Sequence, residues 1–162
     1  MEGVMILKKV LFVCLGNICR SPMAEAVLRD QVQRNNLEHK ISVDSAGTGG
    51  WHTNQPPHEG TRTLLDRYDI SYKGQTARRV RSEDFAEFDY IIAMDAQNIK
   101  DLECIVGTDA DGKITRLTDY IDHPPEADVP DPYYTGDFDY TYELISRGCH
   151  GILNHIRKRH DI

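Results

Sequence analysis

The hydrophobic pattern of the chain alternates between short apolar runs and longer stretches in which apolar residues recur at helical spacing. Residues 9–14 are β-branched and aromatic with no alternation, which is typical of a parallel strand covered on both faces. Residues 41–45 and 90–94 predict two more strands, and residues 114–117 predict a fourth, weaker one. Strands that alternate with helices predict the α/β class, with a four-stranded parallel sheet flanked by helices on both faces.

Helices are predicted where apolar residues recur three and four positions apart behind a capping residue. Ser21 as N-cap, followed by Pro22 at the first helical position, marks the helix after the first strand. The apolar face of the last helix consists of Phe138, Tyr142, Ile145, Cys149, Ile152 and Ile156. The predicted helices begin near Ser21, Pro57, Ser82, Asp95 and Asp137.

The composition, with 40% hydrophobic and 28% charged residues, is that of a globular protein. A length of 162 residues suits one compact domain, so we expect a single domain spanning residues 1–162. The formal net charge of −7 argues against a nucleic-acid partner, because neutralising backbone phosphates requires a surplus of Lys and Arg. No segment of the sequence is apolar enough to span a bilayer.

The first nine residues mix Glu2 with Lys8 and Lys9 and contain no apolar stretch of signal-peptide length. We therefore expect a cytoplasmic monomer that does not insert into membranes. The four cysteines are expected to be free thiols. They are Cys14, Cys19, Cys104 and Cys149. Their spacing lacks paired CxxC knuckles, so we predict neither a metal site nor a cofactor.

One octapeptide follows the first strand at the place where α/β sheets bind ligands, the carboxyl end of a strand. A loop of this size can turn its backbone N–H groups inward, and the N-terminus of the next helix adds partial positive charge. Gly16 permits a positive φ, and Asn17 tolerates one while its amide can pin the loop. The segment therefore predicts an anion cradle. It reads Cys14-Leu15-Gly16-Asn17-Ile18-Cys19-Arg20-Ser21.

Two side chains bring chemistry to this cradle. The helix N-terminus and the nearby arginine favour the thiolate of Cys14, which makes it a candidate nucleophile. The planar donor fork of Arg20 matches two oxygens of one phosphoryl group, which a lysine could not reproduce. Taken singly, such a cysteine is usually a small buried hydrophobe and such an arginine a solvated charge. Together, as Cys-X5-Arg-Ser at a strand-to-helix junction, they favour a site for phosphate esters.

The segment from Val10 to Ala26, VLFVCLGNICRSPMAEA, resembles the signature of the low-molecular-weight protein tyrosine phosphatases. The similarity continues along nearly the whole chain in Asp44-Ser45-Ala46-Gly47 and Asp131-Pro132-Tyr133-Tyr134. The resemblance implies a four-stranded parallel sheet with flanking helices. It also implies hydrolysis of phosphotyrosine in proteins, and of aryl phosphates, through a phosphocysteine intermediate.

The resemblance assigns roles to individual residues. Cys14 would attack the phosphorus, Arg20 would bind the phosphoryl oxygens, and Ser21 would donate a hydrogen bond to the sulfur of Cys14. Asn17 and Ser45 would form hydrogen bonds behind the loop and hold its shape. The other loop residues, Leu15, Gly16, Ile18 and Cys19, would surround the bound phosphate.

Asp131 would be the general acid that protonates the departing phenolate and then the base that activates water. It lies in residues 119–134, a long proline-containing loop of the kind that is often functional. An aspartate before proline is more often a turn residue, and only the resemblance reverses that expectation. Tyr133 and Tyr134 would contact the substrate. Trp51 would wall the cleft, with partial burial in the core as the alternative.

A basic segment, Arg78, Arg79 and Arg81, leaves two interpretations open. It would guide acidic substrates toward a negatively charged protein, or it would be a solvated basic loop. Gln75 stands two residues before Ala77 and Arg78, where some family members have histidine. This difference puts a buried-histidine packing role in doubt.

Three rival functions differ from this pattern. Arsenate reductases on the same fold need a closely spaced further pair of thiols, which is missing here. Nucleotide-binding P-loop enzymes need GxxxxGK[ST], and this chain has Arg20 in place of the lysine. Phosphoarginine phosphatases are closer, but tend to have Thr at the position of Ile18 and an aromatic residue without a hydroxyl after the Asp-Pro pair. Ile18, Tyr133 and Tyr134 therefore favour phosphotyrosine.

Overall fold

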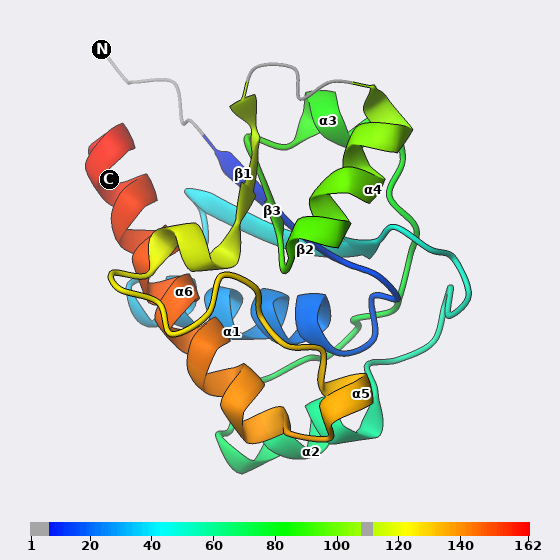
Figure 1. Ribbon diagram of the computed structural model, residues 1–162. Helices are drawn as coiled ribbons and strands as arrows, with labels where there is room; N and C mark the ends of the chain where they lie inside the picture. The colour runs from blue at the N-terminus through cyan, green and yellow to red at the C-terminus, as the bar shows by residue number, and fades with distance from the viewer. Residues whose placement is uncertain (1–6, 108–111) are drawn as a thin grey trace.

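A computed structural model of the protein describes residues 7–107 and 112–162 (Figure 1). Residues 1–6, on which part of the signal-peptide argument rests, lie outside the described residues. In order, the elements are β1 (Lys8–Cys14), α1 (Arg20–Arg34), β2 (Ile41–Gly47), α2 (Glu59–Arg67), α3 (Asp84–Glu87), β3 (Tyr90–Ala93), α4 (Ala96–Val106), β4 (Ile114–Arg116), the 3₁₀ helix η2 (Leu117–Tyr120), α5 (Pro132–Thr135) and α6 (Phe138–His160).

The strands form one parallel sheet in the order β2-β1-β3-β4, which confirms the predicted fold class. Strand β1 is central, and its residues from Val10 to Val13 have no exposed surface. This burial on both faces explains why the run shows no polar alternation. Strand β2 continues to Gly47, beyond the predicted end, whereas β4 stops at Arg116 because Leu117 begins η2.

Helices cover both faces of the sheet (Figure 1). On one face, Phe12 and Ile92 share a core with α1, α2 and α6. On the other face, Leu11 and Ile91 share a second core with Leu102 of α4 and are packed by Phe85 of α3. The two cores hold the carboxyl end of β1 rigidly between two layers of helices.

Three predicted helix starts are shifted. Helix α1 begins at Arg20 behind Cys19, and Ser21 lies inside its first turn because the Ser21 hydroxyl contacts Cys14 instead of capping the helix. Helix α2 begins at Glu59, because the ring of His58 caps it by accepting a hydrogen bond from the Gly60 N–H. Helix α3 begins at Asp84 rather than next to Ser82.

The remaining helix starts agree with the prediction. Asp95 accepts a hydrogen bond from the Asn98 N–H at the start of α4, and Asp137 accepts one from the Tyr140 N–H at the start of α6. Cys149 is fully buried on α6, and all four cysteines are free thiols. Within the described ranges, no helix is long and apolar enough to cross a membrane.

Candidate active site

The loop between β1 and α1 begins with Cys14, the last residue of β1, whose side chain is buried. Asn17 takes the left-handed conformation, with φ 57°, whereas Gly16 does not. The loop therefore uses a positive φ at Asn17 and does not use the one that Gly16 permits. The backbone of Gly16 lies close to His52, and a Cβ there would lie 3.2 Å from Cδ2 of its ring, which is a tight contact.

Two hydrogen-bonding groups face the sulfur of Cys14. The Ser21 Oγ lies 2.9 Å from Sγ, and the backbone N–H of Asn17 donates to Sγ over 3.3 Å. Donors placed in this way stabilise negative charge on sulfur, both before attack and when the sulfur departs. The local geometry thus suits a thiolate nucleophile.

Arg20 is 2% exposed and lies among acidic groups. Its Nη1 donates to Asp95 over 2.7 Å and to the Val129 carbonyl over 2.9 Å, and its Nη2 lies 3.4 Å from Asp131. Burial opposes the charge, but Cys14, Asp95 and Asp131 outweigh it and raise the pKa of the guanidinium. The buried Nε of Arg20 has no partner among the described residues, which leaves one donor for an anionic ligand.

Asp131 reaches the loop from a segment more than a hundred residues later in the chain. It caps the short helix α5, and its Oδ1 accepts a hydrogen bond of 3.0 Å from the Tyr133 N–H. This cap and the ion pair with Arg20 hold its carboxylate at the cleft. The cleft, of about 240 Å³, is lined by Cys14, Leu15, Gly16, Ile18, Cys19, Arg20, Trp51, His52, Asp131, Tyr133 and Tyr134.

Aromatic side chains form the walls of this cleft. Trp51 is 70% exposed, so the alternative of core burial is wrong. Tyr133 and Tyr134 are 56% and 75% exposed, and their rings meet edge to face with centroids 5.3 Å apart. Exposed aromatic faces around an anion cradle suit an aromatic substrate group attached to a phosphate.

Three of the predicted residues do not line the cleft, and their side chains form hydrogen bonds behind the loop instead. They are Asn17, Ser21 and Ser45. The side-chain amide of Asn17 donates to Ser21 Oγ over 2.7 Å and to Ser45 Oγ over 3.0 Å. Ser45 in turn donates to Glu25 over 2.6 Å, and Glu25 is paired with Arg29. Burial raises the pKa of Glu25 in spite of these partners. The loop therefore rests on a connected polar layer.

Sequence reasoning missed three residues that contribute to the site: His52, Asp95 and Glu25. Asp95 follows β3, the neighbour of β1, so its position at the carboxyl edge of the sheet could have predicted a role. His52 adjoins Trp51 but carries no signal of its own. Glu25 lies one helical turn after Ser21 in a run that reads as ordinary helix.

Two further predicted residues have unexpected surroundings. Arg78 does not lie free in solvent, because it is paired with Asp44 and Asp84. Burial, together with the charges of Cys14 and Asp131, raises the pKa of Cys19 to about 12. Cys19 is therefore a neutral thiol at physiological pH, which leaves Cys14 as the thiol placed for chemistry in the cleft.

The arrangement defines a class of protein: an α/β phosphate-ester hydrolase with a cysteine nucleophile. The low molecular weight phosphotyrosine protein phosphatase family model matches residues 9–161. The chain belongs to this family.

Known relatives agree with this assignment. The chain is 55% identical to the low molecular weight protein-tyrosine-phosphatase YfkJ of Bacillus subtilis, over 92% of this chain and 96% of YfkJ. The crystal structure of YfkJ superposes with a TM-score of 0.93, covering 98% of this chain and 99% of that one. PtpA of Staphylococcus aureus is 41% identical, over 92% and 94% of the two chains. A Drosophila arginine phosphatase is 36% identical, with a TM-score of 0.84 and coverage of 92% and 98%.

Proposed function

We propose that this protein is a protein tyrosine phosphatase that hydrolyses phosphotyrosine and aryl phosphate monoesters through a covalent phosphocysteine. One observation carries the proposal: Cys14, Arg20 and Asp131 line a single cleft, and the sulfur of Cys14 is contacted by the Ser21 hydroxyl and the Asn17 N–H from behind the loop. Nucleophile, anion clamp and proton donor are the three parts that this chemistry needs.

In the first step, the Cys14 thiolate attacks phosphorus. The S–P bond forms while the P–O bond to the aryl group breaks, and Asp131 gives its proton to the departing phenolate oxygen. Arg20 binds two phosphoryl oxygens and stabilises the charge that they carry in the transition state. The ion pair between Arg20 and Asp131 would open when the substrate binds.

In the second step, water attacks the phosphocysteine. Asp131, now a carboxylate, takes a proton from water as the O–P bond forms and the S–P bond breaks. The departing sulfur of Cys14 regains the hydrogen bond of Ser21, which lies 2.9 Å away. The residues present supply every proton and charge that the two steps require, so we propose a reaction without metal or cofactor.

The substrate class follows from the walls of the cleft. Trp51, Tyr133 and Tyr134 offer aromatic faces to a phenyl ring. Ile18 also lines the cleft, is 9% exposed, and offers no side-chain hydrogen bond to a polar guanidinium. Phosphotyrosine in proteins is therefore favoured over phosphoarginine, although a Drosophila arginine phosphatase is among the similar structures.

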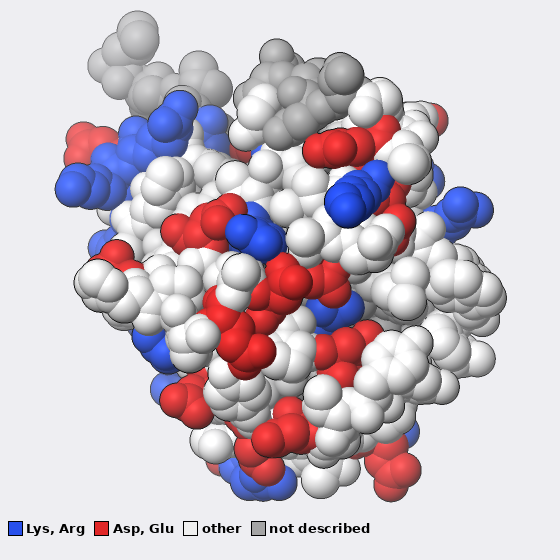
Figure 2. All heavy atoms as spheres, in the orientation of Figure 1, with Lys and Arg blue, Asp and Glu red and all other residues white. Residues whose placement is uncertain are grey.

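The setting that we propose is a cytoplasmic monomer with one phosphatase domain spanning residues 1–162. A nucleophilic thiol stays reduced in a reducing compartment, which supports the cytoplasm. The family model spans nearly the whole chain, which supports one domain. Figure 2 shows acidic side chains gathered over the loop between η2 and α5 and the start of α6. Together with the net charge of −7, this surface supports a protein substrate rather than a nucleic acid.

Side-by-side hydrolysis tests the proposal. p-Nitrophenyl phosphate, phosphotyrosine, phosphoserine and phosphoarginine are incubated with the protein in EDTA. We expect turnover of the two aryl phosphates and little of the other two. Greater turnover of phosphoarginine than of phosphotyrosine would assign the protein to the phosphoarginine phosphatases instead.

A further inference from the structure

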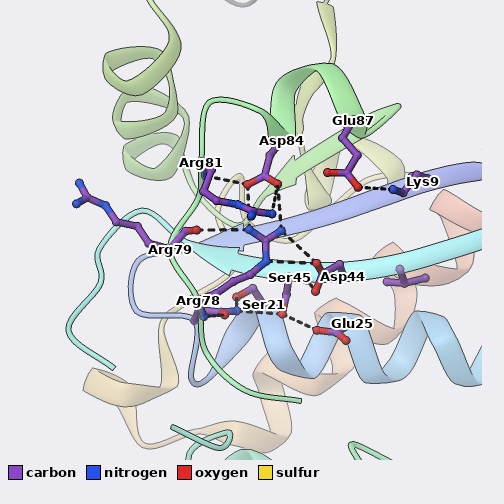
Figure 3. A network of polar contacts seen from close by, with 12 residues as sticks. Lys9, Ser21, Glu25, Asp44, Ser45, Arg78, Arg79, Arg81, Asp84 and Glu87 are labelled. Carbon is purple, nitrogen blue, oxygen red and sulfur yellow. Dashed lines mark hydrogen bonds and ion pairs between the residues drawn. The ribbon is translucent and has the colours of Figure 1, made fainter. Parts of the chain in front are cut away.

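The guanidinium group of Arg78 is clamped between two carboxylates from different elements (Figure 3). Nε and Nη2 donate to Asp44 of β2 over 3.3 and 3.1 Å, and Nη1 and Nη2 donate to Asp84 of α3 over 3.0 and 3.2 Å. Asp84 is completely buried and also accepts a hydrogen bond from the Arg81 N–H over 2.8 Å. Such a bidentate clamp fixes both the position and the plane of the guanidinium.

The backbone of Arg78 is anchored to the sheet as well. The Gly47 N–H donates to the Arg78 carbonyl, and the Val80 N–H donates to the Gly47 carbonyl, both over 2.8 Å. These bonds run beside the end of β2, where Gly47 pairs with Arg79. Side chain and backbone together therefore fix the direction of the remaining Arg78 N–H.

That N–H donates to Oδ1 of Asn17 over 3.0 Å. A backbone N–H can only donate, so the amide of Asn17 must turn its oxygen toward Arg78 and its NH₂ group away. The NH₂ group then has two hydrogens to donate, one to Ser21 Oγ and one to Ser45 Oγ. Arg78 thus decides which way the Asn17 amide faces.

The orientation of the Asn17 amide determines where the hydroxyl hydrogen of Ser21 points. Because Ser21 Oγ accepts from Asn17, its own hydrogen is free to point at the sulfur of Cys14, 2.9 Å away. Ser45 likewise accepts from Asn17 and donates to Glu25. All hydrogen bonds of the layer then run in one sense, and chains of this kind strengthen each bond in them.

We propose that Arg78, clamped by Asp44 and Asp84, is a positioning residue that acts through Asn17 to aim the hydroxyl hydrogen of Ser21 at the sulfur of Cys14. This inference deepens the proposed function, on which its catalytic meaning rests. Without the clamp, only the backbone bonds beside Gly47 hold the Arg78 N–H, so the Asn17 amide is oriented less firmly, the Ser21 hydroxyl can turn, and the hydrogen bond to the thiolate of Cys14 weakens.

The charge balance at the clamp supports this role. Burial works against the charge of Arg78, but the hydrogen bond to Asp84 and the charges of Asp44 and Asp84 raise the pKa of the guanidinium. Arg78 therefore stays charged, and a neutral side chain in its place would leave the buried carboxylate of Asp84 without its main partner.

The test measures the reactivity of Cys14 without a substrate. Wild type, Arg78→Met and Asp84→Asn are alkylated with iodoacetamide over a range of pH, and peptide mapping by mass spectrometry separates Cys14 from the exposed Cys104. In both variants the alkylation curve of Cys14 should move to higher pH by roughly one unit, the worth of one hydrogen bond to a charged group. Glu87→Gln is the matched control.

Glu87 lies on the same helix α3 and also forms an ion pair, but with Lys9 instead of Arg78 (Figure 3). Its substitution should leave the curve in place. Circular dichroism confirms that each variant is folded. If Arg78→Met does not fold, Asp84→Asn still tests the proposal, because asparagine has nearly the same shape as aspartate and removes only the charge. A curve that stays in place in a folded clamp variant would overturn the proposal.

A double-mutant cycle shows whether the effect passes through Asn17. In an Asn17→Ala background, Arg78→Met should shift the curve no further, because the amide that transmits the effect is gone. An equal further shift would mean that Arg78 acts by another route, and would also overturn the proposal. Turnover of p-nitrophenyl phosphate by the wild type, measured separately, tests the proposed function by itself.

Discussion

At the residue scale, the cleft combines side chains with different chemical roles, which come from distant parts of the chain. Cys14 and Arg20 come from one loop, whereas Asp131 arrives more than a hundred residues later on its own capped turn. The ion pair of Arg20 and Asp131 joins the two parts. Asp131 also has a contact of its own, the hydrogen bond from the Tyr133 N–H, so its role can be tested by a substitution that leaves the loop of Cys14 and Arg20 unchanged.

Removal of the proposed acid should slow the reaction selectively. Asp131→Ala should lower the rate of aryl phosphate hydrolysis by roughly two to four orders of magnitude, the usual worth of a general acid. Aryl phosphates with acidic phenols as leaving groups should lose least, since they leave without a proton. Rates for a series of substituted phenyl phosphates measure this dependence. An equal loss for all leaving groups would show that Asp131 is not the acid.

Ile18 bears on the choice between two phosphorylated side chains. Ile18→Thr places a hydroxyl group in the lining of the cleft, where it can hydrogen-bond a guanidinium or position water. The ratio of phosphoarginine to phosphotyrosine turnover should therefore rise. Ile18→Val, which remains apolar, should leave the ratio unchanged. If the ratio stays constant in both variants, selectivity lies elsewhere, for example at Tyr133.

At the element scale, the sequence predicted those elements that depend on residues close together in the chain. The buried strand β1, the loop after it and the capped helices α4 and α6 could be predicted because their signals are contiguous in sequence. The start of α1 was misplaced because the hydroxyl of Ser21 serves Cys14 rather than the helix. Such competition between a cap and a tertiary contact depends on distances that a sequence pattern does not contain.

The parts of the site that sequence reasoning missed depend on long-range placement. In the sequence, Arg78 is one of three basic residues with no sign of a special role. Its partners Asp44 and Asp84 belong to β2 and α3, and only the fold places them beside it. Asp131 could be predicted only from the resemblance to a family, since an aspartate before proline is ordinarily a turn residue. His52 reaches the cleft through the conformation of a loop that has no regular pattern.

Close packing between α6 and η2 gives a prediction about stability. A Cβ at Gly151 would overlap the backbone carbonyl of Tyr120, which cannot easily move. Gly151→Ala should therefore lower the free energy of unfolding by about 1–3 kcal/mol, although alanine ordinarily favours a helix. Urea denaturation measures the change.

Gly148→Ala, one turn earlier on α6, is the matched comparison. Its Cβ would overlap Cδ2 of the buried Leu117 side chain, so this variant should also be destabilised, but by less than Gly151→Ala because the obstacle is a side chain and not the backbone. A Gly151→Ala protein as stable as the wild type would contradict the close contact between α6 and η2.

At the scale of the whole molecule, the buried layer beneath the loop links stability to pH. Burial raises the pKa of Glu25 more than Arg29 and Ser45 lower it. A carboxyl group whose pKa is higher in the folded state stabilises the fold below its unfolded pKa, and this contribution is lost as the pH rises through the folded value. Ionisation of Glu25 therefore costs stability at neutral pH.

Glu25→Gln removes this titration. The free energy of unfolding of the wild type, relative to that of the variant, should be highest below about pH 4, the ordinary range of a glutamate pKa, and should fall as the pH rises above it. Denaturant titrations at a series of pH values measure the difference. A difference that rises with pH would show that the ion pair with Arg29 dominates instead.

The central claim concerns a covalent bond between Cys14 and phosphate. Rapid acid quenching of the protein during turnover of p-nitrophenyl phosphate, followed by peptide mass spectrometry, tests it most directly. We expect phosphate on the peptide that contains Cys14, and none in Cys14→Ser, which should still bind phosphate because the serine leaves the loop intact while being a far poorer nucleophile. Phosphate on another residue, or undiminished turnover in Cys14→Ser, would contradict the account.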